Sequence, residues 1–191
     1  MAGVTEAAEY LQRYLAAREP RLRWLADLAA GTGGPAPEQL DFSRQSLVPL
    51  WEWAMKQFRL RDEDKVVDPT RVPMWYGRSP APAAYWWSDE TLDLIDAVIY
   101  YFGECLRRAV PGARWEVGHA PYRNWVNENQ PVLTGFTSPF NPFLPIPNIV
   151  GRVYYLLRPD EPRPNGIEIP PATAHDLRDQ FDNEMRKVAS P

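Results

Sequence analysis

The residues that could do chemistry are few, and their spacing matches no common catalytic pattern. The chain has two histidines, His119 and His175, and neither has a second histidine or a cysteine at metal-ligand spacing. It has no G-x-S-x-G or S-x-x-K motif for a nucleophile and no glycine-rich loop that would hold phosphate. We therefore predict no catalytic residue, no metal site and no cofactor, and we favour a protein without enzymatic activity.

Cys105 is the only cysteine in the sequence, so an intramolecular disulfide is excluded. It stands among apolar residues, close to Phe102 and Leu106. Reactive thiols lie in exposed, electropositive places, whereas a buried cysteine behaves as a small hydrophobic side chain. We expect Cys105 to pack in the core and to be chemically inert.

Glu104 is the one carboxylate whose neighbours suggest a special role. Tyr100 stands one helical turn before it, and Arg108 stands one turn after it. Glu104 could form an i,i+4 ion pair with Arg108, or it could be a partly buried carboxylate that anchors the strands that follow. Gly103 costs a helix about 1 kcal/mol relative to alanine, which indicates that another element approaches closely at that turn. We predict an architectural role for Glu104.

Five large aromatic residues lie within thirteen positions and form the most conspicuous feature of the sequence: Trp75, Tyr76, Tyr85, Trp86 and Trp87. Glycine and proline residues between them indicate a rigid loop. The rings could close the core over a helix, or they could form a recognition surface, because Trp and Tyr are frequent interface anchors. Successive side chains of an extended segment point to opposite sides, so we expect at least one ring to stay partly exposed.

The elements that would position these residues centre on a helix predicted for residues 88–110. Ser88 is a suitable N-cap, and the charges of the first and last turns complement the helix dipole. Pro111 and Gly112 end the pattern. Apolar residues recur on one face at spacings of three and four: Leu92, Ile95, Ile99, Phe102, Leu106 and Val110.

Weaker patterns predict further elements on both sides of this helix. Two N-terminal helices, at 5–18 and 20–31, are expected to form a hairpin because Pro20 suits the first turn of a new helix. The other expected elements are a helix that starts at Ser46 and runs to 58, strands at 114–119 and 131–136, an edge strand at 167–169 and a C-terminal amphipathic helix. The segment 149–157 fits either a helix or a strand, and Pro147 just before it favours a helix. The proline-rich segment 139–147 either covers the core or docks a partner.

Together these elements predict an α+β protein, in which a central amphipathic helix packs on a small antiparallel sheet and additional helices flank them. A length of 191 residues suits a single domain, 1–191, and 45% hydrophobic residues can bury a substantial core. Within this domain we expect an N-terminal helical hairpin (1–31), a main body (40–157) and a C-terminal helix (171–189).

The formal net charge is −4, and an acidic chain with both signs interspersed lacks the basic surface of a nucleic-acid binder. This charge suits a basic partner, but it is also an ordinary charge for solubility. No secretory signal follows Met1, and no apolar run is long enough to cross a bilayer. We therefore expect a cytoplasmic protein without nucleic-acid or membrane partners.

Three segments are familiar in combination: residues 40–47 (LDFSRQSL), residues 101–108 (YFGECLRR), and the strand of Trp115 followed by residues 129–133 (NQPVL). Their order resembles that of a diffuse set of small, uncharacterised bacterial cytoplasmic proteins, some of which occur as immunity proteins beside secreted toxins. The resemblance spans roughly residues 40–157 and carries over no catalytic residue. The aromatic residues at 75–87 and the segment 139–147 depart from it.

Two functional hypotheses follow. The first is a non-enzymatic intracellular binding protein, of immunity or antagonist type, that binds another protein through the aromatic residues at 75–87 and Glu104. The second is a small-molecule-binding domain, or an enzyme of unrecognised type, in which Tyr100, Glu104 and His119 line one pocket. The oligomeric state is not predicted.

Overall fold

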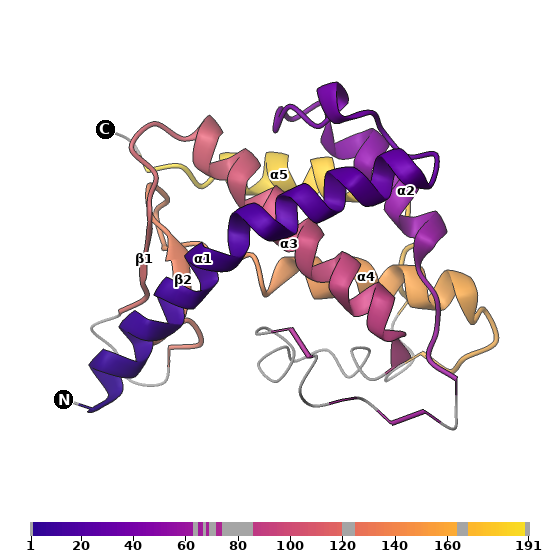
Figure 1. Cartoon of the computed structure of the whole chain (residues 1–191), viewed down its shortest axis with the longest axis horizontal. Coiled ribbons are helices and arrows are strands. Elements are labelled where there is room, and N and C mark those ends of the chain that lie inside the picture. Colours follow the sequence, from indigo (N-terminus) through magenta and orange to yellow (C-terminus); the bar gives the residue numbers. More distant parts are fainter. Residues whose placement is uncertain are drawn as a thin grey trace.

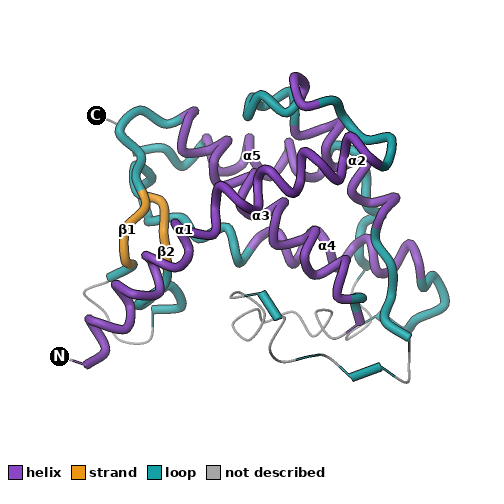
Figure 2. Tube along the Cα trace, viewed as in Figure 1, coloured by secondary structure: helices purple, strands orange, loops and turns teal. Residues whose placement is uncertain are grey.

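The computed structural model describes residues 2–62, 65–66, 68, 72–73, 86–119, 125–163 and 168–189, with side chains from residue 5 onward. Within these residues the chain forms five α-helices, a short 3-10 helix and a two-stranded antiparallel sheet, so the predicted α+β class is confirmed (Figures 1 and 2). The elements are α1 (Ala2–Gly31), η1 (Pro37–Gln39), α2 (Leu47–Gln57), α3 (Asp89–Ala109), β1 (Trp115–Val117), β2 (Pro131–Leu133), α4 (Pro145–Leu157) and α5 (Asp176–Met185).

Helix α3 is the centre of the fold and begins and ends close to the predicted positions. The Ser88 hydroxyl accepts a hydrogen bond of 3.2 Å from the backbone N–H of Thr91, which caps the first turn. Burial extends well beyond the predicted apolar stripe, since every residue from 94 to 106 is buried. The helix is enclosed on all sides because α1, α2, α4 and α5 all pack against it.

Helix α1 is a single helix, so the predicted N-terminal hairpin is wrong. Pro20 lies inside it, although a proline in a helix interior removes a hydrogen bond and costs about 3 kcal/mol. Tyr14 before the proline and Leu25 after it are both completely buried in one core, and this shared packing outweighs the local cost. The helix changes direction part way along (Figures 1 and 2), as expected where a proline interrupts the ladder.

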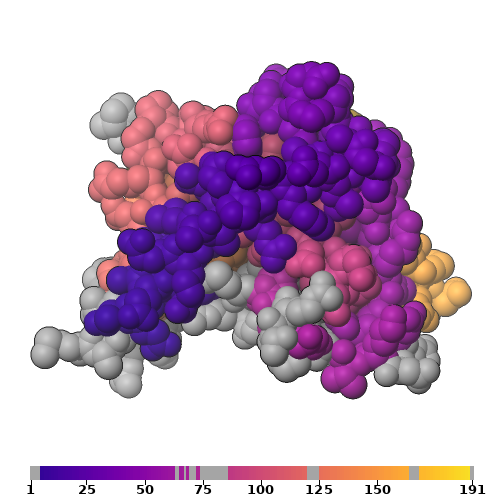
Figure 3. All heavy atoms as spheres, viewed as in Figure 1, coloured from indigo at the N-terminus to yellow at the C-terminus, as the bar shows by residue number. Residues whose placement is uncertain are grey.

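The same helix crosses α3 and covers much of one face of the molecule (Figure 3). Ion pairs supplement the apolar contacts between the two helices. Arg21 of α1 contacts Asp93 at 3.1 Å and Asp96 at 2.9 Å, both on α3. Asp96 is buried, and Arg21 supplies the opposite charge that a buried carboxylate requires.

Helix α2 buries its predicted apolar face, which consists of Leu47, Leu50, Trp51, Ala54 and the following Phe58. Ser46 occupies the N-cap position, but its hydroxyl does not cap the helix. It donates to the carbonyl of Ser43 at 2.7 Å and accepts from the hydroxyl of Tyr101 at 2.7 Å. Ser46 therefore ties the start of α2 to α3.

The sheet is shorter than predicted, with three residues in each strand. Trp115 pairs with Leu133 and Val117 pairs with Pro131. Both strands contact α1, and the indole of Trp115 reaches α3. A Cβ placed on Gly103 would lie 2.9 Å from Cζ2 of Trp115, so the predicted close approach at this glycine is confirmed.

The proline-rich segment 139–147 was expected either to cover the core or to dock a partner, and the structure shows that it covers the core. Phe140 exchanges two backbone hydrogen bonds with Leu133, at 2.7 and 2.9 Å, and both Phe140 and Phe143 are buried. The ambiguous segment 149–157 is helical, as expected, and α4 already begins at Pro145. No strand forms at Glu168 or Ile169, and Ile167 lies outside the described residues. None of the described helices is both long and apolar enough to cross a membrane.

Candidate functional site

The structure describes only part of the aromatic cluster. Trp75, Tyr76 and Tyr85 lie outside the described residues. Trp86 is half-buried, whereas Trp87 is only 1% exposed. These two adjacent rings therefore point to different environments, as expected for an extended approach to the N-cap at Ser88.

Backbone hydrogen bonds hold Trp86 in place. The backbone N–H of Arg61 donates to the carbonyl of Trp86 at 2.7 Å, and that of Ser88 donates to the carbonyl of Arg59 at 3.0 Å. Leu60 and Trp87 form an antiparallel bridge between these bonds. The residues before α3 are thus paired with those that follow α2, and Trp86 is presented from a fixed backbone.

Ring contacts restrict the side chain of Trp86 as well. It stacks on Tyr154 of α4, with ring centroids 4.0 Å apart and an interplanar angle of 24°. Trp87 packs edge-on against the same Tyr154, at 6.2 Å between centroids, and contacts Phe58 at 5.4 Å. Trp87 fills the core, and Trp86 is left as a rigid, half-exposed aromatic surface.

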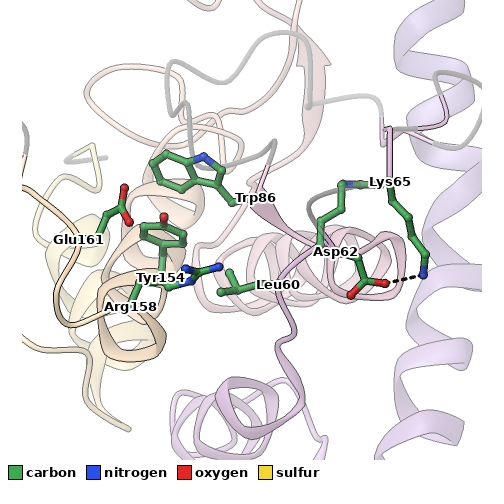
Figure 4. A pocket seen from close by; sticks show the side chains of 8 residues that line it. Leu60, Asp62, Lys65, Trp86, Tyr154, Arg158 and Glu161 are labelled. Carbon is green, nitrogen blue, oxygen red and sulfur yellow. Dashed lines mark ion pairs between the residues drawn. The ribbon is translucent and has the colours of Figure 1, made fainter.

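A pocket of about 360 Å³ opens beside Trp86, and three segments distant in sequence build its walls. We call it the Trp86 pocket; its lining residues are Leu60, Arg61, Asp62, Lys65, Trp86, Tyr154, Arg158 and Glu161. Figure 4 shows Trp86, Tyr154, Arg158 and Glu161 on one side and Asp62 and Lys65 on the other, with Leu60 between them. The site combines two stacked aromatic rings with charges of both signs.

The charged groups of the pocket differ in how well they are satisfied. Lys65 pairs with Asp62 at 2.9 Å, and both are exposed. Arg61 pairs with Asp89 at the start of α3 at 2.8 Å, and the Arg61 side chain is only 8% exposed. Its Nε–H is buried without a hydrogen-bond partner. Burial raises the pKa of the Tyr154 hydroxyl and the nearby Glu161 carboxylate raises it further, so this phenol keeps its proton.

Glu104 lies apart from this pocket, in the contact between α1, α3 and β1. Its carboxylate accepts two bonds of 3.0 Å from Nε and one of 2.9 Å from Nη2 of Arg107. It also accepts a 3.3 Å bond from the indole of Trp115 and contacts Arg18 at 3.5 Å. The expected partner Arg108 instead lies over the ring of Phe42, at 3.7 Å from its centroid. The i,i+4 pair is therefore wrong, and the interpretation of Glu104 as an anchor for the strands is confirmed.

The pKa of Glu104 follows from these contacts. Burial acts to raise the pKa of the carboxyl, but the hydrogen bonds from Arg107 and Trp115 and the charges of Arg107 and Arg18 lower it more. The resulting pKa lies below the usual value for glutamate. Glu104 is therefore ionised at neutral pH, and its contacts position β1 against α3.

Tyr100 and His119, which the second hypothesis placed in one pocket with Glu104, do not lie together with it in one site. Tyr100 is buried and stacks on Tyr14, with centroids 4.6 Å apart. The His119 side chain is 56% exposed, and its Nδ1 lies 3.0 Å from Oε1 of Glu128. The contacts of Tyr100 and Glu104 are made inside the helical core, whereas that of His119 is made on the surface.

Cys105 is buried, as predicted, and burial raises the pKa of its thiol. Within the part of the chain that the structure describes, no three His, Cys, Asp or Glu side chains are placed together to hold a metal ion. The sequence interpretation missed Tyr154, Arg61 and Arg158 as site residues. No local spacing could have found them, because they meet Trp86 only through tertiary packing.

Comparison with known proteins does not add to this geometry. No protein-family model, no curated protein and no solved structure matches the chain.

Proposed function

We propose that this chain is a non-enzymatic binding protein that recognises another protein at the Trp86 pocket. The observation that carries the proposal is the position of Trp86. Its backbone is fixed by pairing with residues 59–61, and its ring is stacked on Tyr154 yet stays half-exposed. A large aromatic side chain held in this way loses little conformational freedom on binding.

The composition of the pocket supports a protein partner. Tryptophan, tyrosine and arginine are the residue types most enriched among those that dominate protein–protein binding energies. All three types line this pocket, as Trp86, Tyr154, Arg61 and Arg158. A volume of about 360 Å³ lies near the lower end of small-molecule sites, and it suits one or two side chains inserted from a partner.

The state of the other candidate residues argues against a catalytic role for them. Glu104 is ionised and fully engaged by Arg107, Trp115 and Arg18, so it has no proton to donate as a general acid. His119 makes its contact elsewhere, with Glu128. The resemblance of segments 40–47, 101–108 and 129–133 is to small uncharacterised bacterial proteins, some of which occur as immunity proteins, and on this ground we propose a partner that the chain antagonises.

The proposal is tested by capture from a lysate of the native host with three forms of the chain. Wild type, Trp86→Ala and Trp24→Ala are immobilised at equal density, and retained proteins are identified by mass spectrometry. Trp24 of α1 is a matched control, because it is also a half-buried tryptophan and it does not line the pocket. Thermal melts of the variants establish that each is folded at the temperature used.

We expect at least one protein to be retained by wild type and by Trp24→Ala and to be lost with Trp86→Ala. The loss should correspond to about 2 kcal/mol or more of binding free energy, as for other central aromatic anchors. Retention of the same proteins by all three forms would contradict the proposal, because binding would then not involve the Trp86 pocket.

A further inference from the structure

We infer that the Trp86 pocket binds a carboxylate group through the guanidinium of Arg61, and that the partner presents this carboxylate beside an apolar or aromatic group. The inference rests on the proposed function, since it names the chemistry by which the partner is recognised. An aspartate, a glutamate or the C-terminal carboxylate of the partner would supply the group.

The first argument is the state of Arg61. Its Nη2 donates to Asp89 at 2.8 Å, and its Nη1 makes only a long contact of 3.5 Å with the carbonyl of Val66. Its Nε–H has no hydrogen-bond partner, although the side chain is only 8% exposed. A buried donor without an acceptor is unfavourable, and a ligand that supplied the acceptor would remove this cost.

The second argument is geometric. The guanidinium presents its N–H groups in a rigid fork that fits a carboxylate better than any single-point acceptor. Asp89 engages this fork through one oxygen to one nitrogen only, so part of the fork remains for another acceptor. Asp89 also lies in the first turn of α3, where the helix dipole stabilises its charge independently of Arg61.

The third argument concerns the size of the ligand charge. Three cationic side chains line the pocket, Arg61, Lys65 and Arg158, against the two carboxylates Asp62 and Glu161. With Asp89, which pairs with Arg61, the formal sum is three minus three, or zero, so the site has no surplus positive charge to hold a dianion. A phosphate dianion would meet both lining carboxylates at close range, and like charges in one site repel. A carboxylate is therefore favoured over a phosphate.

The aromatic wall fixes what accompanies the carboxylate. The half-exposed ring of Trp86 lies in the same pocket as Arg61, and it is held there by stacking on Tyr154, which is only 5% exposed. A ring or alkyl group attached to the carboxylate would pack there, which excludes water and strengthens the charged hydrogen bonds.

The test uses benzoate, a monoanionic carboxylate with an aromatic ring, and NMR detection of arginine Nε–H groups in the full-length chain. The Arg61 resonance is assigned by its absence from the spectrum of Arg61→Lys. Titrations with benzoate, with uncharged benzamide and with inorganic phosphate are compared in the wild-type protein. The titrations are made on the wild-type protein, and Arg61→Lys is needed only for the assignment; its amide spectrum shows whether that variant is folded.

We expect a saturable shift of the Arg61 Nε–H with benzoate and none with benzamide. Arg61→Lys keeps the positive charge and removes the fork, so this substitution should weaken benzoate binding about tenfold or more. Binding to this variant is followed by the backbone amide resonances of other pocket residues. Trp86→Leu should weaken it too, and Trp24→Ala should not. No saturable response to benzoate, an equal response to benzamide, or tighter binding of phosphate would each overturn the inference.

The two proposals fail separately. A benzoate response without any protein captured through Trp86 would leave the carboxylate site standing and would make its ligand a free organic acid. A Trp86-dependent protein partner without a benzoate response would support the proposed function and overturn the carboxylate assignment.

Discussion

Glu104 shows how one carboxylate can organise the contact between three elements. Its side chain is only 3% exposed, while the side chains of its partners Arg18 and Arg107 keep about a third of their surface in water (29% and 34%). Glu104→Gln keeps the shape of the side chain and removes its charge. We expect a loss of about 2–3 kcal/mol in the free energy of unfolding, below the ~3–5 kcal/mol of a fully buried pair because the arginines can be solvated. Chemical denaturation monitored by tryptophan fluorescence measures this difference.

The same carboxylate makes a prediction about pH. Its pKa in the folded chain is lower than in the unfolded chain, so its contribution to stability is present at neutral pH and is lost as the pH falls through about 4 and below. The stability difference between wild type and Glu104→Gln should therefore shrink as the pH is lowered from about 6 to about 3. Other carboxylates with lowered pKa values, such as Asp41 and Asp182, titrate in both proteins and cancel in the comparison. A difference that stays constant with pH would show that the contacts of Glu104 are not ionic.

Ile99 is completely buried in the middle of α3. Ile99→Ala should lower the free energy of unfolding by about 2–5 kcal/mol, through lost burial and the cavity left behind. Val66→Ala is a suitable control, because Val66 is 90% exposed and its truncation should change stability by less than about 0.5 kcal/mol. A denaturation midpoint for Ile99→Ala equal to that of wild type would contradict the enclosed position of α3.

Cys105 should react with a thiol reagent only when the chain unfolds. Burial both blocks access to the sulfur and raises the pKa of the thiol, which reduces the thiolate that reacts. The rate of labelling at neutral pH should therefore rise with denaturant in parallel with unfolding. Fast labelling of the native protein would show that this turn of α3 opens on its own.

Among the helices and strands, the short pairing before α3 separates the roles of two adjacent tryptophans. Trp87→Ala should cost about 3–5 kcal/mol of stability, because its ring is buried against Phe58. Trp86→Ala should cost less than half as much, since this ring is half-exposed and touches mainly Tyr154. Thermal melts of the two variants test the order. Equal losses would mean that Trp86 is as much a part of the core as Trp87.

Local sequence signals predicted the elements that depend on local physics. The cap at Ser88, the charges of the first and last turns and the apolar spacing together defined α3, and all of them act within a few residues. Pro20 led to a wrong prediction because a local rule was overruled by packing: Tyr14 and Leu25 bury themselves in one core only if α1 continues. The close approach at Gly103 was predictable, but its partner Trp115 was not, because the contact is tertiary.

The candidate site was predictable only in part, for the same reason. Trp86 was conspicuous by its type and its aromatic neighbours in the sequence. Tyr154 lies in a segment whose pattern favours a helix, and nothing near it indicates a ring 68 positions earlier as its stacking partner. Arg61 gave no signal at all, since its importance comes from burial and from an N–H without an acceptor.

At the scale of the whole molecule, backbone pairing joins the two ends of the stretch that carries most of the aromatic cluster. The hydrogen bond from Arg61 to Trp86 and the bridge between Leu60 and Trp87 bring together the two ends of residues 62–85. Loop-closure entropy changes by only about 0.6 kcal/mol for each doubling of loop length. Replacing residues 63–84 with a short turn rich in Gly and Asn should therefore keep the fold and cost mainly the packing of Pro73, which is buried; circular dichroism and a thermal melt measure this. A loss of several kcal/mol would instead mean that this stretch is a necessary part of the core.

If the fold survives, residues 63–84 can be exchanged without loss of the fold, because the pairing of residues 60–61 with 86–87 holds the two ends of this stretch together. Substitutions, insertions and deletions there would be released from the selection that preserves the core. Such changes would alter which partner is recognised, while Trp86 and Arg61 keep their positions in the Trp86 pocket. A protein that must follow a rapidly diverging partner could then vary this stretch at little risk to its own folding.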